Sequence, residues 1–182
     1  SAQIEATIRV RQAPVWAPPG PAPQPTPLPG SVTYFVAQDP TVLTGTYQSG
    51  NAASLQSSDS SFYVVQSTSS GGTRLLSYQV VSQTITSPST FTQVQVQFTG
   101  QSNHQGTAML FYVQYAPGTY STTPDSGFTF TQGNTLTTST FYLDTPTVTY
   151  LNSSRVITMR VDGADNSTFT LSTDQIVFTV SP

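Results

Sequence analysis

The chain has 182 residues, of which 36% are hydrophobic and 7% are charged, and its formal net charge is −3. It contains no cysteine and no lysine, which excludes disulfides, thiolate metal sites and lysine-mediated links between subunits. The five arginines are scattered, so the chain lacks the clustered cations that nucleic acid or an anionic membrane surface requires. Ser, Thr and Gln supply the polarity instead, which predicts an extracellular or cell-surface protein whose mature chain is not inserted in a membrane.

The first predicted element is a β-strand within residues 1–12. Apolar and polar residues alternate there, with Ile4, Ala6, Ile8 and Val10 on one face. A single strand is not stable in water, so another surface must cover this apolar face. We therefore expect the strand to be paired with a sheet.

Residues 13–30 form a predicted Pro-rich linker, in which residues 14–30 hold eight of the fourteen prolines. Such a segment favours the polyproline II conformation and could span on the order of 50 Å. A domain of 150 residues has a radius of gyration of only about 15 Å. The linker can therefore carry the N-terminal strand to a neighbouring molecule, with Trp16, the only tryptophan, as a tether anchor on that neighbour.

Residues 31–182 are predicted to form one all-β domain, an antiparallel β-sandwich of the jelly-roll or immunoglobulin-like kind. Turn signals such as Gly100–Asn103 and Asp162–Gly163 separate short segments of strand-forming residues. Between residues 52 and 59 we expect one helical turn at most. The predicted strands are Val32–Ala37, Thr41–Tyr47, Phe62–Ser67, Leu75–Ser82, Phe91–Thr99, Thr107–Tyr115, Phe128–Thr131, Thr138–Leu143, Thr147–Leu151, Val156–Val161, Thr168–Leu171 and Gln175–Val180.

An alternating segment at Ile4–Val10 followed by an all-β domain resembles secreted filament subunits that assemble by donor-strand complementation, such as chaperone–usher pilins and archaeal thread-like filament proteins. The resemblance implies a structural subunit of a head-to-tail homopolymer, in which residues 1–12 insert into the sandwich of the next subunit. Two alternatives stay open: the strand docks on its own sandwich, or the segment is a flexible tail.

Residues for catalysis are sparse, and we expect neither an enzyme nor a cofactor. The only histidine, His104, lies in a predicted hairpin loop, and the chain has no G-x-S-x-G motif. Most aspartates occur in turn contexts, where their side chains bond to nearby backbone. Asp162 and Asp165 form a candidate metal site, since an oxygen-rich loop could hold calcium.

The main rival function is a secreted carbohydrate-binding jelly-roll module, with Tyr112, Tyr115 and Tyr120 as candidate stacking residues for glycans. A viral capsid or appendage protein is a further alternative, in which the N-terminal strand would likewise reach a neighbouring subunit. Asn152 and Asn166 each begin an N-glycosylation acceptor pattern.

Overall fold

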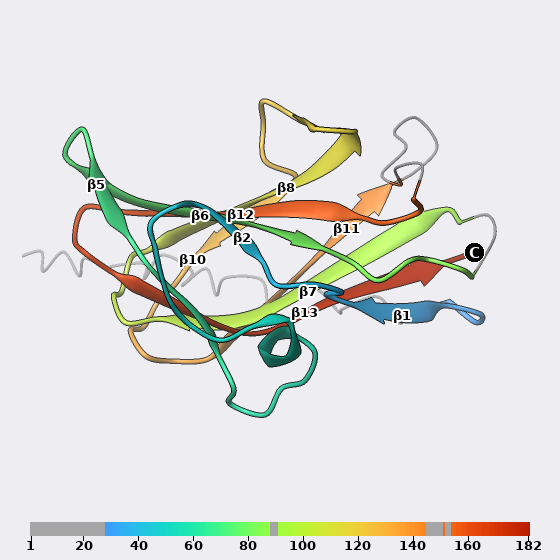
Figure 1. Ribbon diagram of the computed structural model, residues 1–182, viewed down its shortest axis with the longest axis horizontal. Helices are drawn as coiled ribbons and strands as arrows, with labels where there is room; N and C mark the ends of the chain where they lie inside the picture. The colour runs from blue at the N-terminus through green and yellow to red at the C-terminus, as the bar shows by residue number, and fades with distance from the viewer. Residues whose placement is uncertain (1–27, 88–90, 145–150, 152–153) are drawn as a thin grey trace, which may run out of the picture.

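The computed structural model describes residues 28–87, 91–144, 151 and 154–182. Two antiparallel sheets pack face to face as a β-sandwich, which confirms the predicted all-β class (Figure 1). The predicted N-terminal strand and Trp16 lie outside the described residues.

The first sheet is built around β13, the last strand of the chain, which pairs with β7 on one side and with both β4 and β1 on the other. Beyond these neighbours, β11 pairs with β7 and β3 pairs with β4. In sheet order, the strands are β11 (Thr137–Asp144), β7 (Gln93–Ser102), β13 (Thr170–Ser181), β4 (Tyr63–Gln66) and β3 (Thr46–Ser49), with β1 (Val32–Phe35) beside β13.

The second sheet has β12 in its middle, between β8 and β6. Short strands β5 and β9 add to β6 and β8 respectively, and the 3₁₀ turn η1 (Ala52–Leu55) confirms the single helical turn expected there. In sheet order, the strands are β10 (Ser126–Thr129), β8 (Ala108–Ala116), β12 (Thr158–Asp165), β6 (Thr73–Val81) and β2 (Thr41–Thr44), with β5 (Thr68–Ser70) and β9 (Thr119–Tyr120) at the sides.

The strand order is that of a jelly roll. The first sheet reads β11-β7-β13-β4 and the second reads β10-β8-β12-β6, so strands at the same place in the two sheets follow each other along the chain, with only β5 between β4 and β6. From β6 to β13 the chain passes to the other sheet at each step except from β8 through β9 to β10, and this order decides between the two predicted kinds of sandwich in favour of the jelly roll.

The core lies between the two sheets and is filled by alternating positions of their central strands. Val94, Val96 and Phe98 of β7 are fully buried, as the alternation in the sequence predicted. The ring of Phe98 lies 5.2 Å from that of Phe111 on β8, across the sandwich. Each such buried side chain stabilises the fold by about 1.5–3 kcal/mol relative to exposure.

Four predicted boundaries were wrong: one strand is divided, two turns lie largely within strands, and two strands are continuous. The predicted strand at residues 41–47 is divided by Gly45, where the chain passes from the second sheet to the first. Gly45 has φ +100°, and a Cβ there would lie 2.6 Å from the carbonyl oxygen of Gln66. The turns predicted at residues 100–103 and 162–163 lie largely inside β7 and β12. Both glycines are closely packed there, since a Cβ on Gly100 would lie 2.8 Å from the ring of Phe98 and one on Gly163 would lie 3.1 Å from the ring of Phe169. The two strands predicted at residues 168–180 are one, β13, with an irregularity between Thr173 and Gln175.

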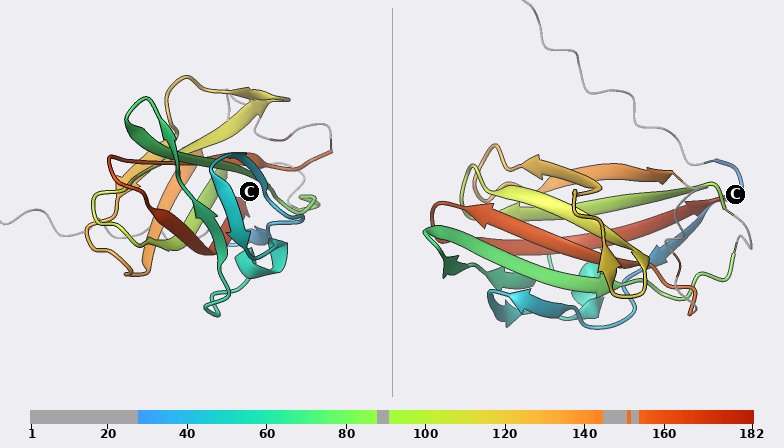
Figure 2. Two further views of the ribbon diagram at one scale, coloured as in Figure 1. Left: turned by 60° about the vertical axis from the view of Figure 1, so that its left-hand side comes forward. Right: turned by 90° about the horizontal axis from the view of Figure 1, so that it is seen from above.

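The two ends of the domain lie together at one end of the long axis of the sandwich (Figure 2). Val32–Phe35 of β1 pair with the final residues of β13, and Ser31 Oγ lies 2.8 Å from Ser181 Oγ. The linker therefore joins the domain beside Pro182. In the described part of the chain, none of the helical segments is long and apolar enough to cross a membrane.

Candidate functional site

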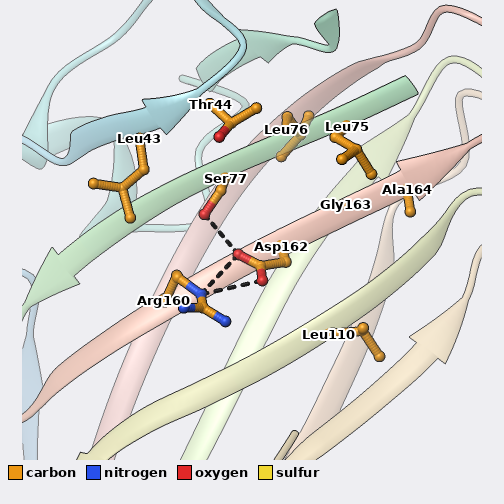
Figure 3. A pocket seen from close by; sticks show the side chains of 10 residues that line it. All are labelled: Leu43, Thr44, Leu75, Leu76, Ser77, Leu110, Arg160, Asp162, Gly163 and Ala164. Atoms are coloured by element: carbon orange, nitrogen blue, oxygen red, sulfur yellow. Dashed lines mark hydrogen bonds and ion pairs between the residues drawn. The ribbon is translucent and has the colours of Figure 1, made fainter. Parts of the chain in front are cut away.

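The outer face of the second sheet carries a cleft of about 450 Å³ (Figure 3). We call it the sheet-face cleft. Strands β6 and β12 form its floor, and β2 and β8 contribute to its sides. It is lined by Leu43, Thr44, Leu75, Leu76, Ser77, Leu110, Arg160, Asp162, Gly163 and Ala164.

Strand register places the polar side chains of the cleft in rows across the sheet. Because Tyr78, Phe111 and Val161 face the core, their neighbours along each strand face outward. Two rows of outward-facing residues follow from the pairing: Gln79, Arg160 and Tyr112 in one, and Ser77, Asp162 and Leu110 in the next. The rows bring together three strands that are far apart in the sequence.

Arg160 is held on three sides. Its guanidinium carbon lies 4.2 Å from the ring centroid of Tyr112 and 4.9 Å from that of Tyr120, which is cation–π geometry with both rings. Its Nε lies 3.0 Å from Oδ1 and 3.1 Å from Oδ2 of Asp162. The side chain therefore has little freedom to leave this position.

A second layer of hydrogen bonds fixes the groups that hold Arg160. Ser77 Oγ donates to Asp162 Oδ1 at 2.6 Å, and the Tyr120 hydroxyl donates to Gln79 Oε1 at 2.7 Å. Burial raises the pKa of Tyr120 above its ordinary value, so this hydroxyl stays protonated and able to donate at neutral pH.

The other end of the sheet-face cleft is apolar. Leu75 and Ala164 lie on its floor and Leu110 on its β8 side, and Leu43, a residue of β2, is 51% exposed. The cleft thus combines an apolar surface with fixed hydrogen-bonding groups. That combination suits a ligand with both apolar faces and polar edges.

Of the three tyrosines predicted for glycan stacking, the structure brings two together. Tyr112 and Tyr120 flank Arg160 at one end of the cleft. Tyr115 points to the other side of β8, where it is 41% exposed. Sequence reasoning missed Arg160 itself, although alternation along β12 would have placed Arg160 and Asp162 on one face.

The predicted metal site at Asp162 and Asp165 does not form, because the two carboxylates lie on opposite sides of β12. Asp162 faces outward and bonds to Arg160, whereas Asp165 bonds to His104 and Thr107 at the end of the strand. Residues three apart in a strand cannot share a face. Among the described residues, no group of three or more His, Asp or Glu side chains is placed to hold a metal ion.

His104 is tied to Asp165 rather than to a nucleophile. Its Nδ1 lies 2.8 Å from Asp165 Oδ2, while its side chain remains 43% exposed. Thr107 Oγ1 donates to the same carboxylate oxygen at 2.9 Å. This arrangement joins the β7–β8 connection to β12.

The remaining predicted sites divide between the described and the undescribed parts of the chain. Ile4, Ala6, Ile8, Val10, Trp16 and Asn152 lie outside the described residues, so their roles stay predictions. Asn166 is exposed in the connection between β12 and β13, where a glycosylating enzyme could reach it.

No protein-family model and no curated protein sequence matches this chain. Among solved structures, it is similar to TmCBM61, solved in complex with β-1,4-galactotriose, with 9% identity and a TM-score of 0.40 over 82% of this chain and 88% of that one. It is also similar to the enzymatically active domain of tailspike protein 4 from bacteriophage CBA120, with 11% identity and a TM-score of 0.45 over 84% of this chain and 19% of that one. Likenesses of this size do not bear on ligand or activity.

Proposed function

We propose that this protein binds a carbohydrate chain in the sheet-face cleft. The observation that carries the proposal is the position of Arg160, which contacts the rings of Tyr112 and Tyr120 and bonds to Asp162 at one end of a cleft whose remaining lining is mainly apolar. Fixed polar groups beside an apolar surface are what a saccharide requires.

A sugar ring presents hydroxyls around its edge and C–H groups on its faces. The hydroxyls would pair with Asp162, Ser77 and the free edge of Arg160, and the C–H faces would lie against Leu43 and Leu110. Because the polar groups already hold one another, little side-chain ordering is needed when the ligand binds. The cleft is therefore preorganised to bind extended glycans with weak to moderate affinity.

The experiment is a glycan array with the full chain, followed by calorimetric titration of the glycans that bind. Tyr112→Ala and Tyr120→Ala should each weaken binding, because Arg160 loses a ring that positions it. Tyr115→Ala is the matched control, since this tyrosine lies on the other side of β8. Binding that survives both cleft substitutions, or no binding to any glycan, would contradict the proposal.

A second candidate is a structural subunit of an extracellular filament, in which residues 1–12 insert into a neighbouring copy. Its support is the position of the linker: the chain enters β1 beside Pro182, at one end of the long axis, which suits a head-to-tail polymer. In such a polymer Ile4, Ala6, Ile8 and Val10 would cover part of the next sandwich.

Electron microscopy of the purified full chain tests this candidate. Deleting residues 1–30 and replacing Ile8 with Asp should both abolish filaments, because the substitution puts a charge on the apolar face of the strand. Thr7→Asp is the matched control, as it adds the same charge to the polar face. Filaments that persist after the deletion would rule out donor-strand assembly.

A further inference from the structure

We infer that the glycan bound by the sheet-face cleft is acidic and that Arg160 receives a uronic acid carboxylate of the ligand. This inference rests on the proposed carbohydrate function and narrows it to one class of ligand. It follows from what Arg160 already bonds to and from what it leaves available.

Among the described residues, the protein uses only one of the three nitrogen atoms of the Arg160 guanidinium. Nε bonds to Asp162, and within the described residues neither terminal nitrogen has a protein acceptor. The side chain is 27% exposed, and in Figure 3 both dashed lines from Arg160 end on Asp162. The terminal nitrogens therefore remain available as a pair of donors at the cleft.

A pair of guanidinium nitrogens matches a planar carboxylate, which can accept two parallel hydrogen bonds from it. Neutral hydroxyls can also accept from Arg160, but without the added strength of a charged acceptor. The rings of Tyr112 and Tyr120, whose centroids lie 4.2 and 4.9 Å from the guanidinium carbon, restrict the movement of the guanidinium and so the directions from which an acceptor can approach it. The geometry selects for the shape of the acceptor as well as for its charge.

The charges of the cleft limit the ligand to a modest negative charge. Arg160 and Asp162 are the charged residues that line it, and they balance each other. Asp162 would repel a densely charged polyanion, in keeping with the overall charge of −3. One carboxylate on each bound sugar, directed at the terminal nitrogens, is compatible with both charges.

The other surfaces of the cleft suit the rest of a uronic acid residue. Its carboxylate projects from one edge of the sugar ring, and the ring itself is uncharged. With the carboxylate at Arg160, the ring would lie over Asp162 and Ser77, and Leu75 and Ala164 form the next row of the cleft beyond them. The row order on the sheet therefore places a hydroxyl-binding pair next to the carboxylate and an apolar surface beyond it.

The test compares three ligands of equal length by calorimetric titration of the full chain: an oligogalacturonate, its methyl ester and the neutral oligogalactan. The ester keeps the shape of the acid and removes its charge. We expect the acid to bind about tenfold to a hundredfold more tightly than the ester, the range for a hydrogen bond to a charged group. Binding of the acid should weaken as NaCl is raised, and binding of the ester should change little.

Substitutions then show whether Arg160 is responsible for the preference for the acid over its ester. Arg160→Gln should bring the affinity for the acid down to that for the ester, and Arg160→Lys should restore only part of it, because lysine keeps the charge without the planar pair of donors. Arg74→Gln is the matched control, since it removes the same charge from β6 in the same sheet. If Arg160→Gln fails to fold, the acid–ester comparison on the unmodified chain still decides.

The outcomes separate the two proposals. Neutral oligosaccharides that bind as well as the acid would overturn this inference and leave the carbohydrate function standing. Binding of sulfated but not carboxylated sugars would also overturn it, because the ligand would then carry the wrong anion. A chain that binds no carbohydrate of any kind would overturn both.

Discussion

Asp165 and His104 form a contact of 2.8 Å between Oδ2 and Nδ1, which joins the end of β12 to the connection between β7 and β8. Thr107 Oγ1 donates to the same oxygen, and the backbone N–H of Ser167 donates to Oδ1 at 3.0 Å. The Asp165 side chain is only 7% exposed, so these hydrogen bonds largely replace the water that would otherwise solvate its carboxylate. One carboxylate thus holds three segments together at this end of the sandwich.

The first prediction concerns the stability that Asp165 contributes. Burial by itself raises the pKa of Asp165, but hydrogen bonds from Ser167, His104 and Thr107 outweigh burial and hold the pKa below its usual value. Since the pKa is lower in the folded state, the charged form stabilises the fold above the unfolded pKa of about 3.9, and this stability is lost as pH falls through the folded pKa. Asp165→Asn should lower the free energy of unfolding by about 1–3 kcal/mol at pH 7, as measured by urea denaturation.

The difference between Asp165→Asn and the unmodified chain should shrink as the pH falls below about 4, because Asp165 becomes protonated first in the unfolded chain and, at lower pH, in the folded protein. Asp59→Asn is the control, because that carboxylate is exposed and its loss should change stability much less. A difference that stays constant between pH 7 and pH 2 would mean that charge is not the cause.

The second prediction concerns a buried hydroxyl pair in the core. Tyr78 and Thr173 share a hydrogen bond of 2.7 Å between their hydroxyl oxygens, and both residues are fully buried. Tyr78→Phe leaves the threonine hydroxyl without this partner, so we expect the free energy of unfolding to fall by about 1–3 kcal/mol. Tyr115→Phe removes a hydroxyl from an exposed ring and should change the thermal midpoint little.

The third prediction concerns the passage of the chain between the two sheets. Gly45→Ala should be strongly destabilising, because Gly45 has a positive φ and a new Cβ would lie 2.6 Å from a backbone oxygen. Gly71→Ala has the same kind of backbone, with φ +57°, but no heavy atom lies within 4 Å of the new Cβ. The thermal midpoint of unfolding should fall further for Gly45→Ala than for Gly71→Ala. Equal decreases in the midpoint would mean that backbone strain alone accounts for both.

The faces of the strands could be predicted from the sequence, but the passages between sheets could not. Alternation at residues 91–99 predicted the core face of β7, with Val94, Val96 and Phe98, because the period of two is a local property, but it did not predict that Gln95 and Thr99 on the opposite face are also buried. The division at Gly45 depends instead on Gln66, and the continuity of β13 depends on Asp174, whose carboxylate accepts from Ser58 Oγ at 2.6 Å and from the N–H of Ser60 at 3.0 Å. These partners are distant along the chain, and Asp174 taken alone is typical of a turn.

The candidate site shows the same division. Tyr112 and Tyr120 could be chosen as aromatic candidates from the sequence, but nothing local connects either of them to Arg160. Register brings Arg160 beside Tyr112 on β8 and beside Gln79 on β6, and register is fixed by the packing of the whole sheet. The cleft is therefore a property of strand pairing, and only its individual residues could be named in advance.

The place of β13 in the first sheet bears on how the chain reaches its native state. β13 follows the other described strands along the chain, yet β7, β4 and β1 all bond to it. Until β13 is in place these three strands have no shared partner, so the first sheet is incomplete. Pairing over such long sequence separations is slow and leaves aggregation-prone intermediates. We therefore expect the first sheet to close only when Thr170–Ser181 pair with their three neighbouring strands, and a chain truncated before Thr170 to remain unfolded.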